Sequence, residues 1–240
     1  MSNISVVILN YKRPDNLINY IIPNLLLNDI VKNIIISHAL PESYFEDFKE
    51  ISKVVHLKHF EENKKFGVFC RFLAAKLADT NCIIFNDDDY LIKNESINKI
   101  FNFWKNDKNI VHGFRGRNIK KNEYIKYDAV QQNVPIVLTQ FACVSKKLIN
   151  IVLDNYKLID PFVKDCIPIW NGEDIFLSLM AILNSEKLNK IHHLYYYGLA
   201  QDHAIHHHEG HYEHRTFILK KILDVFPKLL DLFKKNNYYI

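Results

Sequence analysis

Glycine and cysteine are both scarce in this chain of 240 residues, and each shortage excludes a class of protein. The 6 glycines are too few for a collagen-like repeat or an array rich in flexible linkers. The four cysteines follow no CxxC or paired pattern, which favours a reduced, intracellular chain over a disulfide-rich secreted one. We therefore expect a globular protein without structural disulfides.

Long apolar runs and a strong excess of one charge are also missing. No apolar stretch approaches the roughly 18 residues of a membrane span, and no basic and apolar leader opens the sequence. Lys and Arg number 31 against 27 Asp and Glu, a formal charge of +4. The densest basic stretch, FRGRNIKK (residues 114–121), is interpreted as a solvated face rather than a polyanion site. These features predict a soluble, cytoplasmic protein without a transmembrane segment.

Hydrophobic residues make up 48% of the chain, enough for a sizeable core, and the first hundred residues alternate two kinds of pattern. Short β-branched runs alternate with segments of helical spacing, one of which Pro23 should kink or interrupt. This alternation predicts an α/β fold with a mostly parallel central sheet. The expected strands are 5–10, 33–39, 53–60 and 82–85, and the clearest expected helices are 66–78 and 94–106.

The second half of the chain is less regular. Residues 109–117 and 123–130 resemble additions to a sheet, and residues 135–153 resemble a strand that passes into a helix. Two amphipathic helices are expected at 171–183 and 211–235, the latter interrupted near Pro227. No repeat or linker divides the chain, so we expect one two-lobed domain over residues 1–240.

An acidic cluster follows the apolar strand CIIF, in the stretch CIIFNDDDYL. Ligands of open α/β sheets bind beyond the carboxyl ends of the strands, where Asp87, Asp88 and Asp89 lie. If the segment stays extended, Asp87 and Asp89 point to one side and Asp88 to the other. Two carboxylates on one side suit Mg²⁺ or Mn²⁺, so we predict a metal site of Asp89 and Asp87. An acidic turn before a helix is the structural alternative.

Six segments, in order, resemble the glycosyltransferase A (GT-A) fold, most closely the exostosin-like, family 64 type. They are VVILNYKRPDNL, GVFCRFLAAKLADTNCIIFNDDD, GFRGR, VLTQFACVSKKLI, NGEDIFLSLM and HYEHRTFILKKI. The resemblance implies a Rossmann-like nucleotide-diphospho-sugar transferase that uses a UDP-sugar and Mn²⁺ or Mg²⁺. It also implies a nucleotide-sugar-binding half over residues 1–115 and an acceptor-binding half over residues 116–240.

The resemblance assigns roles to the residues that hold the donor. Arg13 would contact the diphosphate or the uracil region, and Arg71 would hold the nucleotide from the helix before the acidic strand. Asp87 and Asp88 would lie at the ribose and sugar side. Asp89 would be the principal metal ligand.

The catalytic assignment falls on two later segments. By the same resemblance, Asp174 is the essential acid beneath the transferred sugar, Glu173 lies beside it, and Arg215 reaches back to the diphosphate. Departure of a nucleoside diphosphate builds negative charge on the leaving oxygen, which a cation and an arginine stabilise. Positive charge builds on the anomeric carbon, which a carboxylate stabilises. Alone, acids in the first turn of a helix would equally suit the helix dipole.

Several functions are compatible with this set of predicted site residues. The leading one is a metal-dependent retaining glycosyltransferase, with an N-acetylhexosamine as a candidate sugar. The alternatives are an inverting GT-A enzyme with Asp174 as general base, a nucleotidyltransferase that releases pyrophosphate, and a sugar-binding module without turnover. The acceptor can be a glycan, a glycolipid, a protein hydroxyl or modified DNA, and the oligomeric state is undetermined.

The chain departs from the family pattern at two linked positions. The family usually has cysteines where this chain has Gly172 and Ile218, and we would expect those two to form a disulfide. Both are replaced together, as a reduced compartment permits. Animal enzymes of this type are also membrane-anchored, so these departures favour a microbial or viral version and argue against the heparan-type acceptor.

A histidine-rich run, DHAIHHHEGHYEH (residues 202–214), holds six of the 12 histidines. Its spacing matches no defined zinc motif such as HExxH. We interpret it as a loop that covers the bound donor or acceptor. One histidine of the segment His203–His214 is a candidate to complete the metal shell with Asp89.

Overall fold

Parallel strands form one side of the central sheet, as the alternating pattern predicts. The computed structural model describes residues 3–164, 172–200 and 209–238. β1 (Ile4–Asn10), β2 (Val31–His38), β3 (Val54–Lys58) and β4 (Cys82–Asp87) are mutually parallel, in the spatial order β3-β2-β1-β4. All seven residues of β1 are buried, because the sheet is covered on both faces.

The sheet continues with strands from later in the chain. Its eight strands follow the order β3-β2-β1-β4-β11-β6-β12-β9. β11 (Phe141–Ser145) is antiparallel to both β4 and β6 (His112–Gly113), while β12 (Asn189–Ile191) is parallel to β6. β9 (Asn133–Val134) forms the far edge. The predicted α/β class with a mostly parallel sheet is confirmed.

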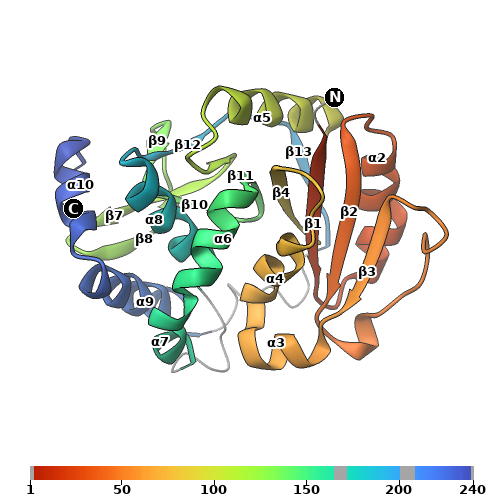
Figure 1. Cartoon of the computed structure of the whole chain (residues 1–240), viewed down its shortest axis with the longest axis horizontal. Helices are drawn as coiled ribbons and strands as arrows, with labels where there is room; N and C mark the ends of the chain where they lie inside the picture. Colours follow the sequence, from red (N-terminus) through yellow and green to blue (C-terminus); the bar gives the residue numbers. More distant parts are fainter. Residues whose placement is uncertain (1–2, 165–171, 201–208, 239–240) are drawn as a thin grey trace.

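Two small sheets accompany the central one. β10 (Ile136–Val137), β7 (Gly116–Lys120) and β8 (Glu123–Asp128) form an antiparallel sheet of three strands. β5 (Tyr90–Ile92) pairs with β13 (Tyr196–Gly198) directly after the acidic cluster. Figure 1 shows the three-stranded sheet beside α9 (His211–Val225) and α10 (Lys228–Lys235), at the opposite side of the view from β3.

Helices fill the connections, and the irregular helix around Pro23 is as predicted. Pro14 begins α1 (Pro14–Asn16), and a π-helical turn at Leu17–Ile21 leads into α2 (Ile22–Leu26). Pro23 lacks an N–H, which explains the irregular helix around it. The predicted helix 66–78 is largely confirmed: a 3₁₀ turn at Gly67–Phe69 leads into α4 (Cys70–Lys76), and Gly67, with a φ of 52°, separates this segment from α3 (Phe60–Phe66), a helix that was not predicted.

The remaining helices agree more closely with the sequence. α5 occupies Asn94–Asn106 as predicted, and α10 begins directly after Pro227, where an interruption is predicted. No helix in the three described ranges has the length and apolar character needed to cross a bilayer. The other helices are α6 (Lys146–Asn155), α7 (Asp160–Lys164), α8 (Glu173–Ser185), α9 (His211–Val225) and α10 (Lys228–Lys235).

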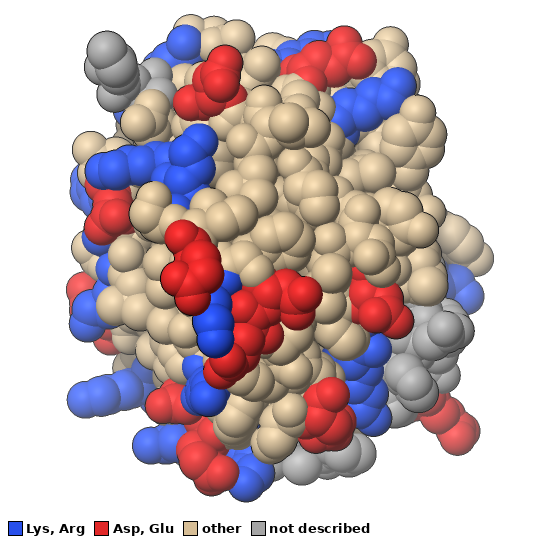
Figure 2. Space-filling model, turned by 90° about the vertical axis from the view of Figure 1, so that its right-hand side faces the viewer, with Lys and Arg blue, Asp and Glu red and all other residues tan. Residues whose placement is uncertain are grey.

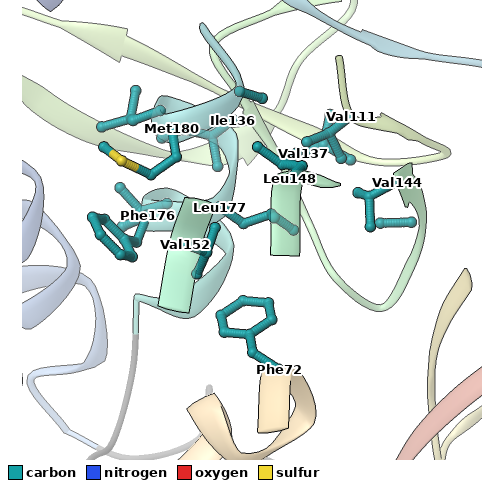
Figure 3. Close-up of a cluster of buried hydrophobic side chains, with 14 of the residues drawn as sticks. Phe72, Val111, Ile136, Val137, Val144, Leu148, Val152, Phe176, Leu177 and Met180 are labelled. Carbon is teal, nitrogen blue, oxygen red and sulfur yellow. The ribbon is translucent and has the colours of Figure 1, made fainter. Parts of the chain in front are cut away.

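The core lies in two layers, one on each face of the sheet. Along β1, Val7 and Leu9 pack into one layer, while Val6 and Ile8 pack into the other. α4, α6 and α8 contribute to the first layer, and α5 to the second. Figure 3 shows Phe72 of α4, Leu148 and Val152 of α6 and Phe176, Leu177 and Met180 of α8 converging in the first layer.

The face turned to the viewer in Figure 2 is the right-hand side of Figure 1, where β3 lies. Lys and Arg are interspersed there with Asp and Glu around a broad uncharged area. The charge on this face is therefore mixed, as the modest formal charge of +4 would suggest.

Candidate active site

The acidic cluster lies at the carboxyl end of β4, beside the carboxyl end of β1. β4 extends through Asp87, and the chain then turns at Asp88 and Asp89 before β5. The predicted extended segment, with Asp87 and Asp89 on one side, is therefore wrong, because the turn interrupts the alternation. Asp88 and Asp89 instead lie beside one arginine, and Asp87 lies beside another.

Arg13 is the shared neighbour of Asp88 and Asp89. It lies at the end of β1, just before the helix that Pro14 begins, and one guanidinium nitrogen forms an ion pair with Asp88. The same nitrogen lies 3.6 Å from Oδ2 of Asp89. The backbone N–H of Tyr11 donates to the other oxygen of Asp88 at 2.7 Å. The structure thus brings together Arg13 and two of the predicted acids.

Arg71 connects the acidic cluster to the start of α8. Its Nη2 lies 3.0 Å from Oδ1 of Asp87 and 3.9 Å from Oε1 of Glu173. Thr139 donates a hydrogen bond of 2.9 Å to the same oxygen of Glu173. Arg71 and Glu173 are both buried, so their charges interact with little solvent screening. Two acidic motifs that are 86 positions apart in the sequence (173 − 87) therefore belong to one site.

Asp174 and Arg215 form the most deeply buried ion pair of the site. Nη2 of Arg215 donates to both carboxylate oxygens of Asp174, at 2.7 and 2.6 Å, and both side chains are buried. The backbone N–H of Ile175 donates to the same carboxylate at 2.8 Å. The guanidinium carbon also lies 4.3 Å from the ring centre of Tyr124, a cation–π contact.

The two positions where the family usually has cysteines are in contact. A Cβ placed on Gly172 would lie 3.5 Å from Cβ of Ile218 and 2.9 Å from two of its outer carbons. The side chain of Ile218 therefore fills the space between α9 and the start of α8. Gly172 has a φ of 94°, a conformation that glycine adopts without strain. Asn171, before it, lies outside the described residues.

Burial and like charge perturb the ionisation of these acids. Burial raises the pKa of Asp88 to about 6, although Arg13 favours its carboxylate form. Burial, together with the charges of Asp87 and Asp88, raises the pKa of Asp89 to about 7. Burial and the charge of Asp174 also raise the pKa of Glu173. Such perturbed acids in a cluster are typical of functional sites.

The arginines are held in the charged form. Burial alone would lower the pKa of Arg215, but the charge of Asp174 outweighs it and raises that pKa. Asp87 and Glu173 likewise raise the pKa of Arg71 above its usual value, against the effect of burial. The site therefore combines arginines that stay positively charged with acids whose charge changes with pH.

The acids offer oxygens to a cation without enclosing one. Oδ1 of Asp89 is buried and accepts no hydrogen bond from any described residue. No three His, Cys, Asp or Glu side chains in residues 3–164, 172–200 and 209–238 converge to hold a metal ion. The donor set fits an ion such as Mg²⁺ or Mn²⁺, which binds one or two carboxylates and completes its shell with substrate phosphates.

Part of the histidine-rich run falls outside the described residues. Residues 203–208 lie outside the part of the chain that the structure describes, and with them most of the predicted metal-ligand candidates. His211 and His214 lie in the first turn of α9, upstream of Arg215. The prediction that this segment completes the metal shell stays a prediction.

The structure adds site residues that the sequence alone did not single out. Thr139 and Tyr124 contact Glu173 and Arg215, but only tertiary packing brings them there. Asn16 donates to the backbone oxygen of Asp88 at 2.9 Å. It lies within the opening motif VVILNYKRPDNL, so that motif held a signal that could have identified it.

Solved structures with a similar fold include two of S. aureus TarS. One structure of TarS superposes with a TM-score of 0.51 at 18% identity, covering 83% of this chain and 37% of TarS. A structure of TarS residues 1–349 with UDP gives 0.55 at 17% identity, covering 92% of this chain and 66% of that one. The chain thus has the GT-A-like fold that the sequence predicts, over less than two thirds of the length of these TarS chains.

A family comparison agrees with the fold. No curated protein sequence shows a significant match to the chain. A profile of the glycosyl transferase family 64 domain matches residues 4–236, a range that includes every predicted site residue. The chain belongs to glycosyl transferase family 64.

Proposed function

We propose that this chain is a metal-dependent, retaining glycosyltransferase that moves a sugar from a UDP-sugar to an acceptor hydroxyl. Residues 1–115 would bind the nucleotide sugar, and residues 116–240 would bind the acceptor. The observation that carries the proposal is the position of Arg71, which contacts Asp87 at the acidic cluster and Glu173 beside the buried pair Asp174–Arg215. Acids and arginines that suit the two ends of a sugar–diphosphate bond therefore adjoin one another.

The arginines suit the leaving group. Cleavage of the bond from the anomeric carbon to the diphosphate leaves the electron pair on a phosphate oxygen, and a charged guanidinium stabilises it. Arg13 follows the end of β1, and the guanidinium group of Arg71, on α4, contacts Asp87 at the end of β4, which is the edge where open α/β sheets bind their ligands. The structure of S. aureus TarS with UDP supports a uridine nucleotide as the donor's base and diphosphate.

Asp174 suits the sugar. As the diphosphate leaves, positive charge builds at the anomeric carbon, and a fixed carboxylate stabilises that charge. Both oxygens of Asp174 accept hydrogen bonds from Arg215, and one also accepts from the N–H of Ile175. This engagement supports a fixed stabilising carboxylate over a general base, and hence retention over inversion. The acceptor oxygen then bonds to the anomeric carbon, and its proton passes to the departing phosphate.

Asp89, with Asp87, would hold the divalent ion. The buried Oδ1 of Asp89, which lacks a donor among the described residues, is the ligand that the geometry favours most. When bound, Mn²⁺ or Mg²⁺ would offset the negative charge of the diphosphate. It would also offset the mutual repulsion of the acids, whose effect is visible in the raised pKa of Asp89.

Donor binding is the first test. Thermal unfolding of the wild type is measured with UDP, GDP or CDP, each with and without Mn²⁺. At UDP near 100 times Kd we expect a Mn²⁺-dependent rise in Tm of roughly 5–10 °C, from about 2.7 kcal/mol of binding energy. Asp89→Ala should abolish the rise. Asp231→Ala is the control, since its carboxylate is 81% exposed on α10.

Catalytic activity is the second test. A panel of UDP-sugars, with UDP-N-acetylhexosamines included, is screened for release of UDP. Retention predicts that the anomeric configuration of the donor is kept in the product, which NMR reads directly. An inverted product would assign the reaction to the alternative mechanism, and release of pyrophosphate would indicate nucleotidyl transfer. If no nucleotide stabilises the protein, or if Asp89→Ala changes nothing, the proposal fails.

A further inference from the structure

The acidic turn, residues 87–90, is fixed through its backbone. Nδ2 of Asn86 donates to the backbone oxygens of Asp87 at 2.7 Å and of Tyr90 at 3.0 Å. The backbone oxygen of Asp89 accepts an N–H from the segment directly after β13, at 2.8 Å. The carboxylates of the turn therefore hold positions that its backbone sets, and a cation bound by them would depend on that backbone.

Arg115, in the connection between β6 and β7, supports this turn at two points. Its Nη1 donates to Oη of Tyr90 at 3.1 Å. The same nitrogen donates to Oε1 of Gln140 at 3.2 Å, and the backbone oxygen of Gln140 accepts the N–H of Asp87 at 2.9 Å. Arg115 thus reaches both ends of the acidic turn, one through Tyr90 and the other through Gln140.

Asp128, at the end of β8, fixes the guanidinium group of Arg115. Nε of Arg115 donates to both oxygens of Asp128 at 3.2 Å, and Nη2 donates to one of them at 3.0 Å. The side chains are 28% and 49% exposed, so the ion pair itself adds little to stability. Its effect is geometric, because a planar guanidinium held along one edge keeps its remaining nitrogen directed at the turn.

Tyr90 can transmit this support to the acids because its ring is firmly packed. It is 5% exposed, and its ring centre lies 5.6 Å from that of Phe114 and 5.5 Å from that of Tyr196. Its backbone lies in β5, which pairs with β13. A hydrogen bond from Arg115 to Oη therefore restrains the residue that directly follows Asp89.

We propose that Arg115 is a positioning residue for the divalent ion of the transfer reaction. Acting through Tyr90 and Gln140, it holds the carboxylates of Asp87 and Asp89 at a spacing that suits a small octahedral ion. The inference rests on the proposed function and deepens it, because it assigns the geometry of the ion site to a residue outside the acids themselves.

A positioning role predicts a change in ion preference as well as in affinity. Mg²⁺ demands near-ideal octahedral geometry, whereas Ca²⁺ accepts irregular sets of oxygens at longer distances. If the acidic turn loosens, the affinity for Mg²⁺ should therefore fall more than the affinity for Ca²⁺. A general loss of structure would weaken the binding of both ions alike.

Ion binding is measured without turnover. The full chain is mixed with UDP and Mn²⁺, and the electron paramagnetic resonance signal of free Mn²⁺ gives its affinity, after correction for Mn²⁺ held by UDP alone. Displacement of Mn²⁺ gives the affinities for Mg²⁺ and Ca²⁺. The variants are Arg115→Ala, Tyr90→Phe, which keeps the ring and removes Oη, and both together. Tyr197→Phe is the matched control, since this side chain on β13 is 54% exposed.

We expect Arg115→Ala, which removes two hydrogen bonds to the supports of the turn, to bind Mn²⁺ and Mg²⁺ about tenfold more weakly. Tyr90→Phe removes one of the two and should bind them about threefold more weakly. Binding of Ca²⁺ should change by less than about twofold in either variant. The double variant should bind as Arg115→Ala does, because both changes remove the same bond. Tyr197→Phe should match the wild type.

Thermal unfolding in EDTA identifies a variant that has lost its fold. If Arg115→Ala unfolds, the ratio of Mg²⁺ to Ca²⁺ affinity in Tyr90→Phe decides the question alone. The inference fails if a folded Arg115→Ala keeps the ion affinities of the wild type, if Mg²⁺ and Ca²⁺ binding weaken equally, or if the two substitutions are additive. If the wild type itself binds no Mn²⁺ in the presence of UDP, the proposed function fails instead.

Discussion

The Asp89 side chain, which suits a metal ion, is expected to lower the stability of the ion-free protein once it is ionised. The folded protein keeps this side chain protonated up to about pH 7, whereas in the unfolded chain it ionises near pH 4. Between these values the folded state binds more protons, so the free energy of unfolding falls as the pH rises. The stability that depends on a protonated Asp89 is fully present below pH 4 and is lost as the pH rises through 7. A carboxylate suited to a metal ion is therefore unfavourable without one.

Asp89→Asn should accordingly stabilise the ion-free protein. In EDTA at pH 8 we expect a gain of about 2–4 kcal/mol, since each pKa unit corresponds to about 1.4 kcal/mol. At pH 4 the gain should disappear. Denaturant titrations between pH 4 and pH 8 measure this directly. Because burial also raises the pKa of Asp88, some pH dependence should persist. The expectation would be contradicted if the free energy of unfolding fell as steeply with pH in the variant as in the wild type, or if the variant were less stable at pH 8.

The pair Asp174–Arg215 should behave as a unit. Both groups are buried, so removing one leaves an unpaired charge, and we expect Asp174→Ala or Arg215→Ala each to cost about 3–5 kcal/mol. The double variant should cost far less than the sum of the two. Urea titrations of the four proteins give the coupling energy. Additive losses would mean that the short distances in the structure carry little energy.

At the scale of elements, the start of α8 and α9 lie close enough for an engineered disulfide to join them. The separation of 3.5 Å between an added Cβ on Gly172 and Cβ of Ile218 lies within the usual range for disulfides. Closing this loop of 46 residues (218 − 172) would stabilise the protein by about 4 kcal/mol, and the φ of 94° would cost about 1–3 kcal/mol.

We therefore predict that Gly172→Cys/Ile218→Cys forms a disulfide and gains about 4 kcal/mol over its reduced form, because both forms carry the same backbone strain at residue 172. Peptide mapping of the oxidised protein identifies the link, and thermal unfolding with and without a reductant measures its effect. Each single cysteine variant serves as a control, since neither can form the bond. Failure to oxidise would show that the two helices hold these positions farther apart in solution.

Elements were predictable where one local signal dominated. Residues 94–106 have clear helical spacing and form α5 within the predicted bounds. The pattern over 66–78 likewise indicated the segment that contains α4, but the boundary with α3 at Gly67 depends on a φ of 52° that the sequence does not reveal. The turn at Asp88 and Asp89 was missed for a related reason, since three identical residues carry no signal that a strand ends between them.

The same limit applies to the site. The predicted site residues come together in ion pairs, Arg13 with Asp88 and Arg71 with Asp87 among them, because order along a known family pattern carries spatial information. The contacts of Thr139 with Glu173 and of Tyr124 with Arg215 join strands and helices far apart in the chain. No spacing rule within one segment could have indicated those contacts.

At the scale of the whole molecule, the two proposed functional halves share one sheet. β11 of the second half lies between β4 and β6 of the first. We therefore predict that residues 1–115, expressed alone, do not fold, because β4 would lose its neighbour and expose apolar residues such as Ile84 and Phe85. Circular dichroism and amide exchange test this, with the full chain as control. A stable, monomeric fragment would contradict it.

The insertion of β11 between two earlier strands also bears on how the protein is made. During synthesis β4 emerges more than 50 residues before the strand that pairs with its free edge (141 − 87 = 54), and such late, non-local pairing slows folding. The site needs still more of the chain, since it draws on Arg13 near the start and Arg215 in α9. A ribosome-bound chain stalled before residue 215 would contain the acidic cluster but not the pair Asp174–Arg215, so the proposed transfer activity would arise only late in translation.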